Sequence, residues 1–393
     1  MQLRTIVLFT IGVSFALAVT VGAARFFTVK PVEPFSDSLD FLHLPDGFRV
    51  RLFADGLGSL SVSKPGPNNG ARLMTVREGA VYVAVPQDSA IYVLRDADGD
   101  GRAEQKNVFL GGLRKPHNID FYRDWAYIAA ENKILRVQDA DRNHRADVGT
   151  AQTILALPQG GHWTRTVKII GEAMYVSIGS TCNACEEANP FRAAIHKCDL
   201  QGNQCAVFAR GLRNAVDFIW HDSKIYATDN GRDLLGNNIP PDEVNSVEKG
   251  GHYGWPYCYG NNMHDNDFDK NVYIRDPCAD MTPPLIELPA HVAPLGLAVY
   301  TGETFPGPWR GKLFIAYHGS WNRQPPSGYK VVAADIETGE LNDFATGWLA
   351  PSDGEGLSDE TVFGRPVGIV NWHGGLLVSD DTAGAVYWIT YTP

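Results

Sequence analysis

Short apolar runs alternate with polar turns along most of the chain. In the first repeat, residues 71–76, 80–85 and 90–94 form three such runs, and later repeats contain two or three each. Runs of this length, rich in β-branched and aromatic residues and bounded by turn residues, are typical of strands. We find no convincing amphipathic helix of ordinary length. The pattern therefore predicts an all-β protein.

An arginine or histidine stands just before, or at the start of, the first apolar run of each repeat. The six positions are Arg72, His117, His162, Arg213, His291 and Arg365. The first two steps between them are 45 residues each, the third is 51, and the last two, of 78 and 74, contain long insertions at 231–284 and 319–329. A period of about 45 residues with three or four strands is typical of a propeller blade. We therefore expect a six-bladed β-propeller of four-stranded antiparallel blades, spanning residues 36–393.

The last repeat, at 365–391, has room for only three strands. Residues 48–53 have the composition of a strand and lie at the other end of the chain. We expect them to supply the fourth strand of the last blade, because this closure removes an open sheet edge that would otherwise invite aggregation.

The first strand of each blade lines the central channel of a propeller, so the six basic positions should meet at one mouth. Six unrelated surface charges are the alternative, and their common register argues against it. Clustered cations are costly without a counter-charge, so we expect a small anionic ligand on the axis. The chain as a whole carries 34 basic and 45 acidic residues, a net charge of -11, which disfavours nucleic acid and anionic membranes as partners.

The first residues have the features of an export segment. One positive charge at Arg4 precedes an apolar run at 5–24 that ends in small residues. This pattern indicates a signal peptide, and the run is also just long enough to be a membrane anchor. In both cases we expect residues 1–35 to lie outside the fold and the body of the protein to face an extracytoplasmic space, periplasmic or secreted.

Six cysteines agree with an oxidising compartment. Cys198 and Cys205 flank a turn-rich hairpin tip, and 258 and 278 bracket a polar loop. Cys182 and Cys185 form a C-x-x-C motif, but the histidine that c-type haem attachment needs is absent, and no second pair suggests zinc. We expect all six cysteines to form disulfides.

An acidic turn at 96–101 resembles the first half of a calcium loop. Asp96, Asp98 and Asp100 supply the acidic positions, but Asn107 stands where a bidentate glutamate would close the loop. A tight polar turn between strands is the commoner role of such residues. A structural calcium and a simple turn both remain open.

Several short motifs, in order, resemble the soluble sugar dehydrogenases that depend on pyrroloquinoline quinone (PQQ), the glucose/sorbosone dehydrogenase family. The matching segments are Gly-Gly-His at 160–162, Gly-Leu-Arg-Asn-Ala at 211–215, Asp-Glu-Val-Asn at 242–245, Tyr-Gly-Trp-Pro at 253–256, Val-Ala-Pro at 292–294 and Asp-Thr-Ala-Gly at 381–384. Each is weak alone, but together they cover almost the whole chain after residue 45. Thr-Arg-Thr at 164–166 and Gly-Ser-Trp-Asn-Arg at 319–323 resemble the sorbosone/pyranose branch more than glucose dehydrogenase.

The resemblance implies a six-bladed propeller with a planar tricarboxylate quinone over its axis. Arginine suits such a ligand, because its guanidinium pairs with carboxylates bidentately and stacks on flat rings. Calcium would bind the quinone through backbone carbonyls of the turn formed by Gly254, Trp255 and Pro256. The candidate cofactor-binding residues are Arg72, His117, Arg165, Arg213, Asn214, His291, His318, Trp321, Arg323 and Arg365.

The resemblance also implies a reaction. His162 would act as the general base on a sugar hydroxyl or aldehyde hydrate while hydride passes to the quinone. A separate acceptor, such as a cytochrome or a quinone, would then take the electrons. One departure is Gly161, where the glucose enzyme has an acidic residue. A calcium-dependent lactonase and a non-catalytic propeller that binds an anion or a protein partner are the alternatives. The first would need acidic and amide side chains around a central metal.

Overall fold

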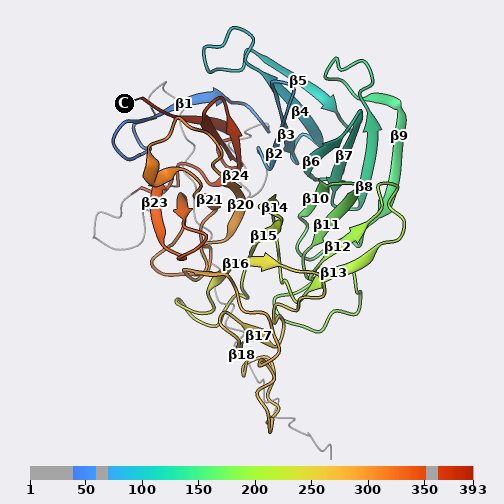
Figure 1. The fold of residues 1–393 in the computed structure, drawn as a ribbon, viewed down its shortest axis with the longest axis vertical. Helices are drawn as coiled ribbons and strands as arrows, with labels where there is room; N and C mark the ends of the chain where they lie inside the picture. Colours follow the sequence, from blue (N-terminus) through green and yellow to red (C-terminus); the bar gives the residue numbers. More distant parts are fainter. Residues whose placement is uncertain (1–38, 59–69, 351–361, 393) are drawn as a thin grey trace, which may run out of the picture.

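The computed structural model describes residues 39–58, 70–350 and 362–392, which form six four-stranded antiparallel sheets arranged in a ring (Figure 1). The six-bladed propeller expected from the repeats is thereby confirmed. Within these ranges the only helical element is the 3-10 turn Gly307–Trp309. No helix in the described part of the chain is long and apolar enough to cross a membrane. The predicted export segment at 1–35 falls outside the described residues.

The first three blades follow the chain without interruption. Blade 1 contains β2 (Met74–Arg77), β3 (Ala80–Val85), β4 (Ala90–Arg95) and β5 (Gln105–Leu110). Blade 2 contains β6 (Pro116–Tyr122), β7 (Trp125–Ala130), β8 (Lys133–Gln138) and β9 (Asp147–Ala156). Blade 3 contains β10 (Arg165–Ile170), β11 (Ala173–Ile178), β12 (Ala194–Cys198) and β13 (Ala206–Arg210).

The other three blades carry the insertions and the closure of the ring. Blade 4 contains β14 (Phe218–His221), β15 (Lys224–Asp229), β16 (Asp242–Val247) and β19 (Ile286–Leu288). Blade 5 contains β20 (Pro294–Val299), β21 (Leu313–Tyr317), β22 (Lys330–Ala334) and β23 (Leu341–Ala345). Blade 6 contains β24 (Pro366–Trp372), β25 (Gly375–Asp380), β26 (Ala385–Tyr391) and β1 (Phe48–Ala54).

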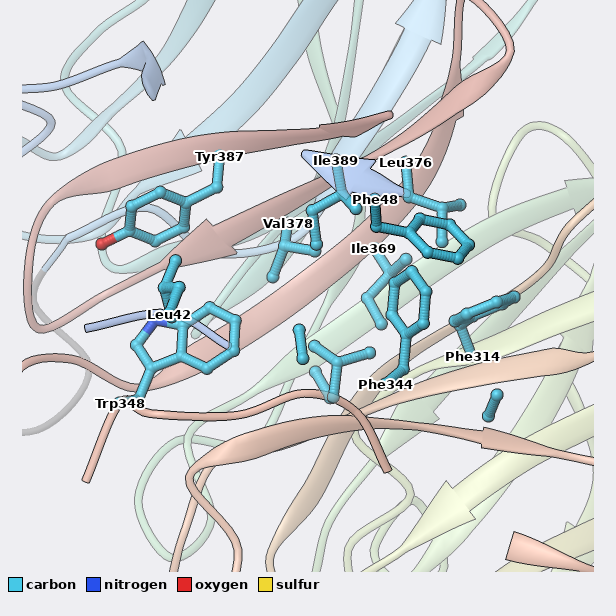
Figure 2. Close-up of a cluster of buried hydrophobic side chains, with 14 of the residues drawn as sticks. Leu42, Phe48, Phe314, Phe344, Trp348, Ile369, Leu376, Val378, Tyr387 and Ile389 are labelled. Atoms are coloured by element: carbon cyan, nitrogen blue, oxygen red, sulfur yellow. The ribbon is translucent and has the colours of Figure 1, made fainter. Parts of the chain in front are cut away.

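Strand β1 closes the ring as the sequence predicted. It pairs antiparallel with β26, with Phe48 opposite Tyr391. The Phe48 ring also meets Phe305 and Phe344 edge to face, at centroid distances of 4.8 Å and 5.0 Å, in the buried cluster that joins blades 5 and 6 (Figure 2). The closing strand is therefore held both by its ladder and by aromatic packing.

One predicted insertion contains a strand that the sequence pattern concealed. Strand β16 lies inside 231–284 and is the third strand of blade 4. Its polar residues Asp242, Glu243 and Asn245 are buried, so an apolar run is not what marks this strand. The rest of the insertion contains the short pair β17 (Cys258–Tyr259) and β18 (Met263–His264), which projects from the ring (Figure 1).

All six cysteines form disulfides, as expected. The pairs are Cys182–Cys185, Cys198–Cys205 and Cys258–Cys278.

The acidic turn differs from the expected loop in how it closes. Glu104, rather than position 107, brings its carboxylate within 4.8 Å of those of Asp96, Asp98 and Asp100. Asp96 accepts hydrogen bonds from the backbone N–H groups of Gly99 and Gly101. These bonds are those of a tight polar turn.

Candidate active site

The six basic positions belong to the segments that begin the first strands of the six blades, but they do not form one open ring. Arg72 and Arg365 join a buried network around Asp381, together with His117 and His318. His162 and Arg213 form a second group between blades 3 and 4. His291 stands apart, with its Nε2–H donating to the carbonyl of Gly236 at 2.7 Å.

Asp381 is the internal counter-charge of the first group. It accepts from Arg72 Nη1 at 2.6 Å and from His318 Nε2 at 2.9 Å. Burial opposes ionisation of this carboxyl, but His318 and Arg72 outweigh it and hold its pKa at about 2. These clustered cations therefore do not need an external anion, contrary to our expectation, because the fold supplies a carboxylate of its own.

The two histidines of this network are neutral. A guanidinium can only donate, so Nε2 of His117 accepts from Arg72 at 3.2 Å and Nδ1 of His318 accepts from Arg365 at 3.4 Å. Burial lowers the pKa of both histidines; at His318 the carboxylate of Asp381 opposes this shift without reversing it, and neighbouring arginines lower the pKa of both rings further. These side chains can orient the arginines but add no positive charge.

Arg365 has donor capacity to spare. It makes one short hydrogen bond, from Nη2 to the Tyr329 hydroxyl at 2.8 Å, and two long ones from Nη1. Its guanidinium lies 4.9 Å from the centre of the Tyr329 ring. Arg365 can therefore still bind a carboxylate.

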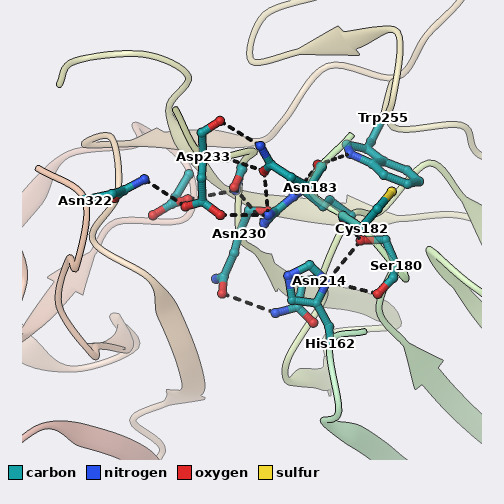
Figure 3. Close-up of polar contacts among 12 residues, drawn as sticks. His162, Ser180, Cys182, Asn183, Asn214, Asn230, Asp233, Trp255 and Asn322 are labelled. Atoms are coloured by element: carbon teal, nitrogen blue, oxygen red, sulfur yellow. Dashed lines mark hydrogen bonds and ion pairs between the residues drawn. The ribbon is translucent and has the colours of Figure 1, made fainter. Parts of the chain in front are cut away.

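His162 is oriented by Ser180 (Figure 3). Its Nδ1 lies 3.0 Å from the Ser180 hydroxyl and 3.1 Å from the Ser180 carbonyl. The hydroxyl itself donates to the Cys182 carbonyl at 2.7 Å, so both Ser180 oxygens are acceptors toward Nδ1. The proton therefore sits on Nδ1, and Nε2 carries a lone pair.

The charge environment keeps His162 neutral. Burial lowers its pKa to about 3, and Arg213, Arg165 and Arg192 add to this effect, although the Ser180 carbonyl opposes it. An imidazole with such a pKa is available as a proton acceptor throughout the neutral range.

Arg213 and Asn214 are fixed by Asp229. The carboxylate of Asp229 accepts the backbone N–H of Arg213 at 2.9 Å and that of Asn214 at 2.6 Å. The Asn214 side chain then lies against Gly179, where an added Cβ would come within 2.4 Å of Asn214 Oδ1 and 2.8 Å of His162 Cβ. The glycine therefore allows the asparagine and the histidine to approach each other.

Arg213 uses every N–H group of its guanidinium within the protein. Nε donates to the Asn183 carbonyl, Nη1 to the carbonyls of Asn230 and Gly231, and Nη2 to Asn183 Oδ1 and Asp233 Oδ2. The distances run from 2.8 Å to 3.1 Å. A cofactor carboxylate could pair with the edge of Arg213 only by displacing these bonds, so its expected bidentate role is not the one the geometry favours.

Asn183 was not recognised from the sequence, although it stands inside the C-x-x-C motif. Besides Arg213, it accepts the indole N–H of Trp255 at 3.2 Å and the backbone N–H of Asp233 at 2.7 Å (Figure 3). Asn322 Nδ2 donates to the other oxygen of Asp233 at 2.9 Å. Loops of blades 3, 4 and 5 therefore meet at this asparagine and this aspartate.

The remaining candidates serve different purposes. Arg165 donates to the backbone carbonyls of Pro158, His162 and Thr164, and so stabilises the loop at 158–164. Arg323 donates to the Asn237 carbonyl at 2.7 Å and to Asn238, joining the two long loops. Trp321 is 60% exposed beside them.

The predicted metal turn borders a small cavity of about 20 Å³, which has room for one water or ion. Trp255 and Pro256 line it together with Asp229, Glu243 and Asp265. The carbonyl of Gly254, the first residue of the predicted turn, accepts the N–H groups of residues 257 and 258 rather than facing a metal. Burial raises the pKa of Asp229 to about 7 and that of Glu243 to about 8. Buried carboxylates and carbonyls are the oxygen donors that calcium prefers, and the cavity supplies them, although Arg213 and Arg232 also line it.

Comparison with known proteins agrees with this geometry. The TrAA12-like family matches residues 85–392. An uncharacterized protein of Borreliella burgdorferi is 31% identical over 373 residues, covering 89% of this chain and 91% of that protein. The PQQ-dependent pyranose dehydrogenase of Coprinopsis cinerea is 36% identical over 129 residues, which are 28% of this chain and only 17% of that protein.

Solved structures share the fold. The holo form of the pyranose dehydrogenase PQQ domain from Coprinopsis cinerea has a TM-score of 0.71 at 22% identity, covering 89% of this chain and 97% of that one. The calcium structure of Trichoderma reesei Carbohydrate-Active Enzymes Family AA12 has a TM-score of 0.72 at 19% identity, covering 94% and 100%. The resemblance that the motifs indicated is confirmed, and the chain belongs to the TrAA12-like family.

Proposed function

We propose that this protein is an oxidoreductase that uses PQQ and calcium to oxidise a sugar, such as an aldose, a pyranose or a sorbosone-like aldehyde hydrate. The observation that carries the proposal is the state of His162, whose Nδ1–H is committed to Ser180 and whose Nε2 is a neutral acceptor. The PQQ-dependent dehydrogenase and the PQQ domain that the chain is similar to support the cofactor.

Different residues of this chain have different roles in the proposed reaction. When bound, PQQ would supply the electron sink for hydride from the substrate carbon. His162 Nε2 takes the proton of the substrate hydroxyl as that hydride leaves. The Ser180 carbonyl then stabilises the charged imidazole through Nδ1–H, and the ring keeps its orientation. Arg365 binds a carboxylate of the cofactor, while Arg213 holds the loops around it.

Calcium would occupy the cavity beside Trp255 and Pro256, with Asp229 and Glu243 as oxygen donors. There it would act as a Lewis acid toward the cofactor. A separate carrier, a cytochrome or a quinone, would take the electrons. Three disulfides favour an extracytoplasmic location, periplasmic or secreted, for this reaction.

The lactonase alternative is less well supported. Near the axis, Arg72, His117, His318 and Arg365 gather around the carboxylate of Asp381. A central metal held by several carboxylates and amides would need a different set of side chains at this position.

The test reconstitutes the purified protein with PQQ and calcium and follows reduction of an artificial electron-accepting dye with a panel of aldoses, pyranoses and aldehydes. Activity should require both additions. His162→Gln should keep the cofactor affinity and lower turnover by about 10²–10⁴-fold. Turnover near wild type in that variant would remove the base assignment, and failure to bind PQQ by titration calorimetry would remove the proposed function.

A further inference from the structure

The loop that carries the candidate base is held by two arginines rather than by a strand ladder. This loop, residues 158–164, precedes β10 and is called the His162 loop below. Arg165 donates to three of its carbonyls from within the same segment. Arg192, from the segment before β12, donates to the carbonyls of Gln159 at 2.6 Å and Gly160 at 2.9 Å, and to that of Gly179 at 3.2 Å.

These contacts matter because the backbone of the His162 loop is unusual. Gly160 and Gly161 both have positive φ, 79° and 62°. An added Cβ on Gly161 would lie 2.5 Å from Thr181 Cα, so the loop rests directly on the segment that orients the imidazole. Carbonyls that face inward from such a turn need donors. The two arginines supply them.

The arrangement carries an electrostatic cost. Arg165 and Arg192 are close enough for Arg192 to lower the pKa of Arg165, which burial and this neighbour bring to about 9. Within the described residues, neither arginine forms an ion pair with a carboxylate. Arg192 is 4% exposed, and its nearest acidic influences are Glu187 and Glu131. Buried cations without a paired carboxylate are destabilising, so backbone carbonyls must compensate here.

Arg192 also binds the backbone segment that contains Gly179 and Ser180. The Gly179 carbonyl that it binds belongs to the residue packed between His162 and Asn214. Its fork therefore joins the two backbone segments, the His162 loop and 179–180, between which the imidazole is fixed. We propose that Arg192 is a positioning residue that fixes His162 for proton abstraction. This inference rests on the proposed function of His162.

The experiment compares Arg192→Ala, Arg192→Lys and, as a matched control, Arg136→Ala in protein reconstituted with PQQ and calcium. Arg136 also donates to a backbone carbonyl, that of Leu200, but lies in blade 2 away from the site. We expect Arg192→Ala to lower kcat by about 10–10²-fold, the scale of a misplaced catalytic group, with KM and PQQ affinity unchanged. Arg192→Lys should recover only part of kcat, because an ammonium lacks the planar fork. The control should match wild type.

Two further readouts separate positioning from general stability. Millimolar guanidinium should restore kcat of Arg192→Ala, whereas ethylammonium should not, and amide hydrogen exchange should accelerate in peptides covering 158–164 but not in other blades. Wild-type kcat in Arg192→Ala, or equal loss of kcat and PQQ affinity, would overturn the inference. If the alanine variant does not fold, the lysine variant carries the same comparison. Loss of turnover in His162→Gln with normal kcat in Arg192→Ala would reject this inference alone. Retained turnover in His162→Gln would reject the base assignment of His162 and this inference with it, whereas failure of the wild-type protein to bind PQQ would reject the proposed function.

Discussion

Calcium removal should destabilise this protein much more at pH 8 than at pH 5.5. The reason lies in the cavity beside the Trp255–Pro256 turn. Burial raises the pKa of Asp229 from 3.8 to about 7 and that of Glu243 from 4.5 to about 8. Without a cation, the folded protein must keep these carboxyls protonated or bear buried negative charge.

The sign and size follow from proton linkage. A carboxyl with a raised folded-state pKa binds its proton more tightly in the folded protein than in the unfolded chain. Its stabilising contribution is complete below about pH 4 and is lost as the pH rises through 7 to 8. For Glu243 the pKa rises by about 3.5, so at 1.36 kcal/mol per pKa unit the loss could reach about 5 kcal/mol, an upper limit. Under the proposed function, calcium would bind the deprotonated form and reverse that loss.

The assay measures urea unfolding midpoints in calcium-free buffer and in 1 mM calcium, on the order of a saturating concentration for extracellular sites. The calcium-dependent gain should be several-fold larger at pH 8 than at pH 5.5. In Glu243→Gln calcium should add little, and the calcium-free protein should lose only the part of its pH dependence that Glu243 supplies, because burial also raises the pKa of Asp229, Asp242 and Asp380 to about 7. The reasoning fails if the gain is equal at the two pH values, or if calcium-free protein becomes more stable between pH 5.5 and 8.

Three other results are expected. Arg213→Lys should lower both the melting temperature and the PQQ affinity, because an ammonium offers three donors to the five acceptors around Arg213. An unchanged melting temperature would contradict the role of Arg213 as a loop anchor. Replacing Cys182 and Cys185 with serine should weaken PQQ binding in calorimetry and change the melting temperature little, because the disulfide encloses Asn183 beside the site. A PQQ affinity equal to that of the wild type would contradict this prediction. Phe48→Ala should cost about 3–5 kcal/mol in urea unfolding, as for other buried phenylalanines, and a loss below about 1 kcal/mol would show that the aromatic cluster does not hold β1.

The fold could be predicted because most strands of each repeat are recognisable from the local pattern of hydrophobic and polar residues. Most strands are apolar runs bounded by turns, and β1 shows the same composition although its partner β26 lies at the other end of the chain. Strand β16 was missed because three of its buried residues, Asp242, Glu243 and Asn245, are polar and interrupt the apolar run. Asp242, for example, accepts the backbone N–H groups of Gly231 and Ala293. Such partners come from distant segments and leave no periodicity in the strand itself.

The sequence placed the candidate residues within the repeat but could not give their contacts. The basic positions belong to the segments that begin the first strands of the blades. Which of them keeps a free hydrogen bond depends on side chains that arrive from other segments, such as Asp381 for Arg72 and Asn183 for Arg213. Arg192 has no place in the repeat at all. A single sequence without relatives offers no signal that would distinguish it from a surface arginine.

Equivalent positions in the repeat therefore have different roles, some structural and some available to a ligand. A basic side chain at the start of a blade is buried at the axis and must satisfy its charge locally or expose it to a ligand. Arg72 meets a carboxylate and Arg213 meets a set of carbonyls, so both become part of the framework. Arg365 retains donor capacity, and His162 retains a lone pair on Nε2. One cation with spare donors and one neutral base suit a reaction that binds an anionic cofactor and removes a proton, because a protonated base beside these arginines would be strongly disfavoured.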